Sequence, residues 1–218
     1  MYDKETIWIE LSKIDEHLSN TPGQIEKLRK AKLLAPESPI ANYLLAKTLS
    51  SNQKYEEAIS LFKAIFQINP QEYRNSMEYA KVTVIYGNGN EISIKEAIAI
   101  LQQSTLNGYS DPYFISTLGE LLFLDKQFAE SEAIFQEVQK RELQYMFKPL
   151  FYPSSWNINN TFAGTVKYVG AGYSKILIDG YNEVTCASSK VNNIILQINM
   201  KVNVDLNFNM KGPIAYIN

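Results

Sequence analysis

Few residues in this chain are of the types that carry out acid–base, nucleophilic or metal chemistry. The 218 residues include one histidine, His17, and one cysteine, Cys186. Histidine-based metal sites and Cys–His dyads need such groups together, so these sites have few possible members here. We expect His17 to be a surface or packing residue and Cys186 to be a small core residue. The sequence therefore predicts no enzyme, no metal site and no cofactor.

Other chemical motifs are missing as well. The glycine-rich stretches at 87–89 and 170–172 lack the following helix and lysine that phosphate binding would need. Adjacent acids such as Glu56 and Glu57 point in different directions on a helix, so we interpret them as part of a solvated face. We find no nucleophile elbow and no zinc pattern. Binding, rather than catalysis, is the function class that remains.

Composition and charge narrow the class of protein. Apolar residues make up 45% and charged residues 20%, as in folded soluble domains, and the length suits one large or two small domains. The net charge of -2 gives no global attraction to nucleic acid. The N-terminus lacks a signal pattern, no apolar run has the length of a membrane span, and Cys186 has no partner for an internal disulfide. We therefore expect a cytoplasmic protein that does not enter the membrane.

Two halves of different composition predict two domains. Residues 1–145 carry apolar residues at helical spacing, whereas 161–218 are rich in Val, Ile, Thr, Asn and Gly. Between them, 146–160 is an aromatic-rich linker that contains Pro149 and Pro153, and proline stops a helix. Residues 161–218 hold five lysines and three acids, a local charge of +2.

The helical half contains an internal repeat. Pro36 and Pro70 are 34 residues apart, and the clearest unit runs from Pro39 to about Glu72. This unit resembles the tetratricopeptide repeat, a pair of antiparallel helices. The residues at the signature positions are Leu45, Ala46, Leu49, Tyr55, Ala58, Phe62 and Pro70. Ile65 stands where the family prefers alanine, and Asn42 replaces its usual tryptophan.

The resemblance covers residues 5 to about 140. A second good match consists of Leu118, Gly119, Leu122, Phe128 and Phe135. The first unit is weaker, and the third contains an elongated turn at 87–90. Any antiparallel helical bundle would show amphipathic stripes, but the joint match of spacing, alanines and prolines favours the repeat. The resemblance implies an α-α superhelix of helical hairpins.

In this family the first helix of each unit lines a concave groove that holds peptides or partner helices. The resemblance implies these groove residues here: Ile40, Tyr43, Lys47, Met77, Lys81, Tyr113, Ser116 and Glu120. Their mixed charge lacks the basic clamp of family members that capture acidic tails.

The C-terminal half predicts about five short strands. Asp179-Gly180 is a hairpin signal, and Val202, Val204, Leu206 and Phe208 alternate with polar residues, as in a half-buried strand. The half resembles the cold-shock type of oligonucleotide-binding (OB) fold, because it opens with Gly-Thr-Val-Lys at 164–167 and closes with Gly-Pro-Ile-Ala at 212–215. The resemblance implies a small all-β, OB-like barrel, and the whole chain is then an α+β protein of two domains.

The family's nucleic-acid site is depleted here. Cold-shock proteins stack bases on aromatics of the second and third strands, and the matching stretches at 174–178 and 183–188 hold none. The candidates that remain are Lys167, Tyr168, Tyr173 and Lys175. The barrel is interpreted first as a scaffold or protein-contact module.

The sequence thus favours a non-enzymatic adaptor that binds a protein or peptide through its helical repeats. The alternative is a single-stranded RNA- or DNA-binding protein that uses the C-terminal domain. Self-association is a further possibility, and the identity of the partner does not follow from the sequence.

Overall fold

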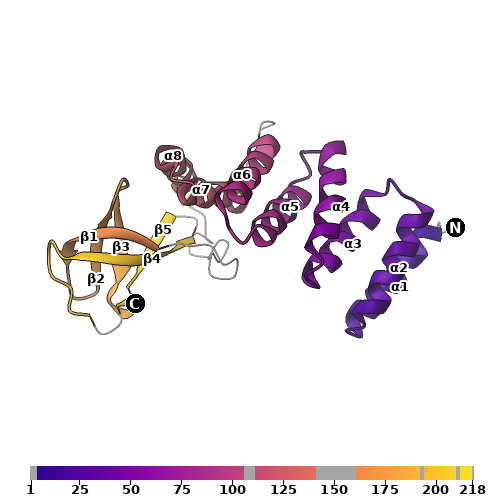
Figure 1. The fold of residues 1–218 in the computed structure, drawn as a ribbon, viewed down its shortest axis with the longest axis horizontal. Helices are drawn as coiled ribbons and strands as arrows, with labels where there is room; N and C mark the ends of the chain where they lie inside the picture. Colours follow the sequence, from indigo (N-terminus) through magenta and orange to yellow (C-terminus); the bar gives the residue numbers. More distant parts are fainter. Residues whose placement is uncertain (1–3, 106–110, 141–160, 192–193, 210–211, 218) are drawn as a thin grey trace. The chain divides into compact units, whose positions relative to one another are not determined.

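The structure is a computed structural model that describes residues 4–105, 111–140, 161–191, 194–209 and 212–217. These described residues form eight α-helices followed by five β-strands (Figure 1). They divide into two compact units, 1–87 with 99–109 and 88–98 with 110–218, which we describe separately. The predicted linker at 146–160 lies outside the described residues.

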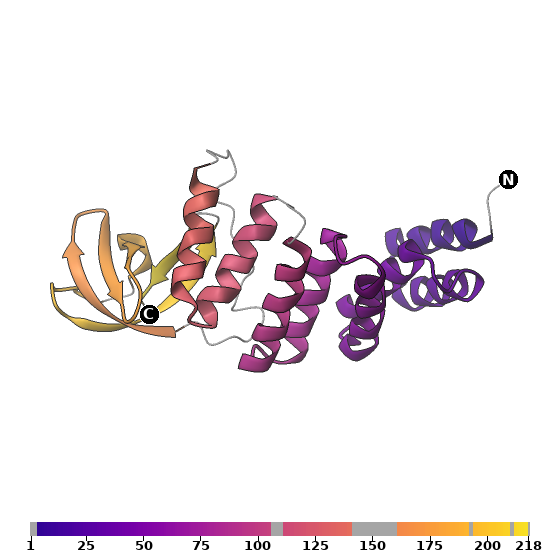
Figure 2. The same cartoon turned by 90° about the horizontal axis from the view of Figure 1, so that it is seen from above.

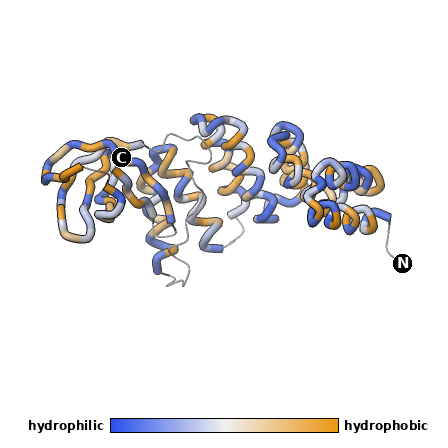
Figure 3. Tube along the Cα trace, turned by 90° about the horizontal axis from the view of Figure 1, so that it is seen from below, coloured by the Kyte–Doolittle hydropathy of each residue, from blue (hydrophilic) through white to orange (hydrophobic). Residues whose placement is uncertain are grey.

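The helices follow the predicted hairpins. They are α1 (Lys4–His17), α2 (Thr21–Leu34), α3 (Pro39–Ser51), α4 (Tyr55–Ile68), α5 (Tyr73–Tyr86), α6 (Glu91–Thr105), α7 (Pro112–Leu124) and α8 (Phe128–Gln139). The pairs α1/α2, α3/α4 and α7/α8 pack against each other. Figure 3 shows hydrophobic and hydrophilic residues mixed along each helix, as expected where one face is buried.

Local chemistry sets where these helices begin. Ser38 and Asp111 precede helices with proline at the first position, where its missing N–H costs nothing. Their side-chain oxygens accept hydrogen bonds from the backbone N–H of Ala41 (3.3 Å) and Phe114 (3.0 Å). Each bond satisfies a donor that the first turn leaves free.

The sequence repeat appears as a repeated hydrogen bond within the first unit. The side-chain amide of Asn42 donates to the carbonyl of Pro36 at 2.8 Å, and the hydroxyl of Ser76 donates to the carbonyl of Pro70 at 3.2 Å. The two donors occupy the same position relative to their proline, in successive repeats. Asn42, which departs from the family pattern, therefore links α3 to the loop that precedes it through a hydrogen bond.

The predicted elongated turn at 87–90 is confirmed. Asn88 and Gly89 both have positive φ, 50° and 62°. Glycine and asparagine tolerate this left-handed conformation. The side chain of Asn90 then accepts a hydrogen bond from Ser93 N at 2.8 Å at the start of α6.

The second unit contains a five-stranded antiparallel sheet. Its strands are β1 (Thr161–Val169), β2 (Tyr173–Ile178), β3 (Glu183–Ala187), β4 (Lys201–Asn209) and β5 (Gly212–Tyr216), in the order β3-β2-β1-β4-β5. The predicted hairpin after β2 is confirmed, with Gly180 at φ +82°. The outer strands β3 and β5 pack together, and Val191 and Ile217 form a parallel bridge beside them. The strands therefore curl into a nearly closed barrel (Figure 2).

The barrel and the last helical hairpin share one hydrophobic core. The alternation in β4 is confirmed, because Val202, Val204, Leu206 and Phe208 are all buried, and Cys186 is buried beside them. Phe123 of α7 with Phe135 and Val138 of α8 belong to the same cluster. The core of the barrel thus includes side chains that precede residue 145 in the sequence.

Candidate functional site

The predicted groove residues of the first unit lie on α3 and α5, which contact each other. Ile40, Tyr43 and Lys47 belong to α3, and Met77 and Lys81 belong to α5. Ile40 is 64% exposed and Lys47 is also exposed, while the other three are partly buried. An exposed isoleucine and a partly buried tyrosine thus lie within one helical turn of each other on α3.

Two of these residues border a small hollow of about 240 Å³. The residues that line it are Pro39, Ile40, Tyr43, Leu44, Ile65, Glu72, Arg74 and Asn75. Its walls come from α3, α4 and the start of α5. The hollow has the size of a single side chain rather than of a cofactor.

Tyr43 is the fixed apolar element of this hollow. Its ring meets Phe62 edge to face, with centroids 6.1 Å apart, which holds the side chain in place. Burial raises the pKa of the Tyr43 hydroxyl, and the carboxylate of Glu78 raises it further. The hydroxyl therefore remains protonated at neutral pH and is available as a hydrogen-bond donor.

Charged groups stand at the start of α5. Arg74 donates from Nε to the hydroxyl of Tyr73 at 3.1 Å, and its guanidinium lies 5.6 Å from the centre of the same ring. The hydrogen bond raises the pKa of Arg74. Glu72 accepts a hydrogen bond from Arg74 N at 3.2 Å and caps the helix. One cation and one carboxylate thus border the hollow.

Asn75 contributes a buried acceptor to the wall. Its side-chain amide nitrogen donates to the carbonyl of Phe62 at 3.0 Å, which fixes the orientation of the amide. Its Oδ1 is buried and accepts no hydrogen bond from the part of the chain that the structure describes. An unpaired buried acceptor costs about 1–3 kcal/mol, and because this oxygen is buried, a partner on the surface does not reach it.

Sequence reasoning named Ile40 and Tyr43 but missed the rest of the lining. Leu44 lies next to a core position of the repeat and Ile65 occupies one, so neither was expected to line a surface hollow. Arg74 occupies the position in its repeat that Ile40 occupies in the one before, so the period itself could have placed it on the same face of the next unit.

The predicted groove residues on α7 belong to the second unit. Ser116 and Glu120 are 0% and 1% exposed, so neither offers an exposed surface. Tyr113 is partly buried and packs against the core shared with the barrel. Apolar residues occur on every side of α7, for example Phe114 and Leu121, and a helix that is apolar all round is buried.

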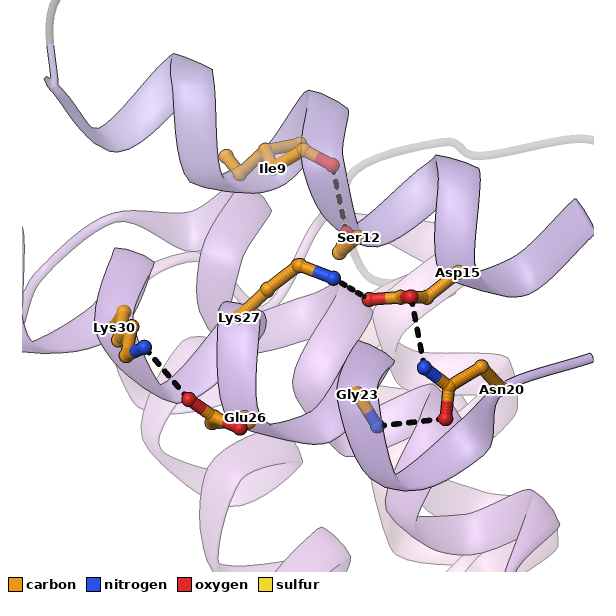
Figure 4. Close-up of polar contacts among 8 residues, drawn as sticks. All are labelled: Ile9, Ser12, Asp15, Asn20, Gly23, Glu26, Lys27 and Lys30. Atoms are coloured by element: carbon orange, nitrogen blue, oxygen red, sulfur yellow. Dashed lines mark hydrogen bonds and ion pairs between the residues drawn. The ribbon is translucent and has the colours of Figure 1, made fainter. Parts of the chain in front are cut away.

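The α1/α2 hairpin contains a buried ion pair (Figure 4). Lys27 of α2 donates to the carboxylate of Asp15, whose side chain is 6% exposed. Asn20 donates to the other carboxylate oxygen at 3.0 Å and accepts from Gly23 N at 3.3 Å. The bond from Lys27 is the main cause of the lowered pKa of Asp15. A Cβ at Gly23 would lie 2.9 Å from the Asp15 carboxylate, so the close approach requires glycine.

In the barrel, the structure brings together three of the four predicted nucleic-acid residues, because Tyr168 of β1 is paired with Lys175 of β2 and its ring meets that of Tyr173. The rings of Tyr168 and Tyr173 are tilted, with centroids 5.3 Å apart, and both residues are 44% exposed. Lys167 is exposed on the same strand as Tyr168. Lys175 forms an ion pair with Glu183 at 3.5 Å, which offsets part of its charge.

Among the described residues, no group of three or more His, Cys, Asp or Glu side chains is arranged to hold a metal ion. Burial raises the pKa of the Cys186 thiol, which opposes formation of the reactive thiolate. None of the described helices has both the length and the apolar character of a membrane-spanning segment.

Comparisons with known proteins identify the fold of the helices. No protein-family model and no curated protein sequence matches the chain. Among solved structures, MamA from Desulfovibrio magneticus RS-1 is 16% identical over 65% of this chain and 77% of its own, with a TM-score of 0.55. YrrB, a tetratricopeptide-repeat (TPR) protein with an unusual peptide-binding site, is 16% identical over 62% of this chain and 67% of its own, with a TM-score of 0.52. A thermophilic TPR protein of Thermus thermophilus is 16% identical over 63% of this chain and 74% of its own, with a TM-score of 0.50. The helical part of this chain therefore has the fold of tetratricopeptide-repeat proteins.

Proposed function

We propose that the chain is a non-enzymatic adaptor that binds a segment of a partner protein on the α3/α5 surface. The observation that carries this proposal is the hollow beside Ile40 and Tyr43, where an exposed isoleucine and a fixed tyrosine border a space for one apolar side chain. The TPR fold of the helices supports a protein partner, as the peptide-binding site of YrrB illustrates.

The chemistry of the surface defines the preferred segment. An aliphatic or aromatic side chain fills the hollow against Tyr43. Lys47 and Lys81, at equivalent positions of successive repeats on α3 and α5, favour acidic groups that flank this anchor. Ser116 and Glu120 are buried and stay outside this proposed site.

Selection of displayed peptides on the full-length chain tests the proposal. Selected peptides are then labelled and titrated by fluorescence polarisation against the wild type and the variants Tyr43→Ala and Lys47→Ala. We expect Tyr43→Ala to weaken binding by roughly tenfold or more, as for an aromatic anchor in a pocket. Lys63→Ala, an exposed lysine on α4, is the matched control and should bind as the wild type does. Equal affinity for all four proteins would show that the selected peptides do not bind on the α3/α5 surface.

We infer further that the barrel is of the oligonucleotide-binding type. The support is its strand order, β3-β2-β1-β4-β5, with β3 packed on β5 and the parallel bridge between Val191 and Ile217. Five strands that close in this way fit the small barrel of that class. An experimental structure of the chain tests the strand order directly. The proposed division into 1–145, 146–160 and 161–218 and the cytoplasmic location remain predictions.

The exposed pair Tyr168 and Tyr173 supports single-stranded nucleic acid as a second candidate ligand, because bases stack on such rings. Polarisation titrations with short RNA and DNA at low salt test it, since electrostatic binding is strongest there. Binding that is lost in Tyr168→Ala but kept in Tyr86→Ala, an exposed helical tyrosine, would establish this role. A flat titration would exclude it.

A further inference from the structure

Helix α1 has two apolar faces, and only one of them packs inside the first unit. Ile9 is 7% exposed and clusters with Ala31 and Ala41. The second face carries Ile7 and Ile14, which are 47% and 54% exposed.

The second face is completed by Leu11, which is partly buried, and by Leu18, which directly follows the last residue of α1, donates its N–H to the carbonyl of Ile14 at 3.0 Å and is 71% exposed. We call Ile7, Leu11, Ile14 and Leu18 the α1 stripe. Its members follow one another at steps of four, three and four residues, the spacing of core positions in a two-helix coiled coil. At about 100° per residue, the centre of the stripe lies ~130° around the helix from the buried Ser12. The stripe is therefore a separate surface and not the margin of the packed face.

We propose that the α1 stripe pairs antiparallel with the α1 stripe of a second copy of this chain. The four positions are symmetric about the point midway between residues 12 and 13. A two-fold axis at that point places Ile7 opposite Leu18 of the second copy, and Leu11 opposite Ile14 of the second copy. Every layer then joins one isoleucine to one leucine, which satisfies the self-complementarity that a two-fold interface requires.

Polar residues that flank the stripe complement each other in the antiparallel arrangement. Glu10 and His17 each precede a leucine of the stripe, and in an antiparallel pair these flanking positions face each other across the interface. The carboxylate of Glu10, which also pairs with Lys13 of its own helix at 2.6 Å, thus meets the imidazole of His17 in the second copy, and the symmetry makes this contact twice.

One helix face of four side chains is smaller than a standard stable interface. The pair is therefore a reversible dimer whose population rises with protein concentration. Because the stripe is separate from the α3/α5 surface in sequence and in its residues, this proposal is independent of the proposed peptide binding.

Sedimentation velocity on the full-length chain over a wide concentration range tests the dimer. We expect the weight-average mass to rise towards that of two chains, and Ile14→Asp to weaken association by roughly tenfold or more, because it buries a charge. Ile92→Asp, at a 78% exposed isoleucine of α6, is the matched control and should associate as the wild type does. Circular dichroism is the control for folding, and both variants should keep their helices because the changes are at exposed positions.

A charge exchange tests the partner and the orientation. His17→Glu should weaken the dimer, and the double variant Glu10→Lys with His17→Glu should restore it. In oxidative cross-linking, Ile7→Cys mixed with Leu18→Cys should give a disulfide-linked dimer, whereas Ile7→Cys alone should not. A monomer at every concentration, a dimer unaffected by Ile14→Asp, or cross-linking of Ile7→Cys with itself would each overturn the proposal.

Discussion

The ring of Phe123 in α7 and the ring of Tyr181 in the turn after β2 meet edge to face, with centroids 4.7 Å apart. Phe123 also packs edge to face against Phe128, Phe162 and Phe208, at centroid distances of 4.9, 5.3 and 5.3 Å. One helical side chain thus contacts aromatic rings of α8, β1, β4 and the β2–β3 turn. This contact links the last TPR-like hairpin to the barrel within a single core.

Phe123→Ala should therefore destabilise the barrel as well as the helices. Phe123 is fully buried, and removal of such a ring costs about 3–5 kcal/mol. We expect faster amide hydrogen exchange at Val204 and Leu206 in β4, as measured by mass spectrometry or NMR. Tyr86→Ala, which truncates a 55% exposed ring, is the control and should leave this exchange unchanged. Unchanged exchange in Phe123→Ala would show that the barrel is stable without the helical contact.

A truncation separates the barrel from its helical contacts. Residues 161–218 alone lack Phe123, Phe135 and Val138, which belong to the same core. We expect this fragment to unfold at lower urea concentration than the fragment 111–218, as followed by circular dichroism. Equal midpoints for the two fragments would show that the barrel is an independent domain.

The ion pair between Asp15 and Lys27 in the first hairpin predicts that the free energy of unfolding decreases at acid pH. The pKa of Asp15 is lowered in the folded chain, chiefly by the hydrogen bond from Lys27, so the folded state prefers the ionised carboxylate. The stabilisation is present above the unfolded pKa and is lost as the pH falls through the lowered folded pKa. Urea unfolding at neutral and acid pH should show a smaller loss on acidification in Asp15→Asn than in the wild type. Glu16→Gln, an exposed neighbour, should behave as the wild type does.

Tyr181 predicts that the free energy of unfolding also decreases at alkaline pH. Burial, followed by the carboxylate of Glu132, raises the pKa of Tyr181 to about 12. The folded state therefore holds this proton more strongly than the unfolded state, whose tyrosines titrate near ~10. Stability should fall as the pH rises from the unfolded value through 12, and Tyr181→Phe should reduce that fall. The tyrosinate absorbance, taken as the difference between wild type and variant, measures this pKa. A transition near the ordinary tyrosine value would contradict the partly buried position of Tyr181.

Much of the architecture follows from sequence periodicity. The regular spacing of Pro36 and Pro70 predicted helical hairpins, and the alternation in 202–208 predicted a half-buried strand, because these signals depend on local geometry alone. The resemblance to the tetratricopeptide repeat also pointed to Ile40 and Tyr43, which border the hollow. It did not reveal that Ser116 and Glu120 are buried, since their exposure depends on what packs against α7.

The sequence by itself determined the helices, the strands and the residue types available for binding, because hydrogen bonding and amphipathic spacing act over a few residues. Only the tertiary structure decided which surfaces are open. Phe123, Phe135 and the barrel strands are far apart in the chain, so no local pattern could show that they form one core. The same holds for the α1 stripe: its spacing is visible in the sequence, but only packing on one face of α1 shows that the other face remains exposed.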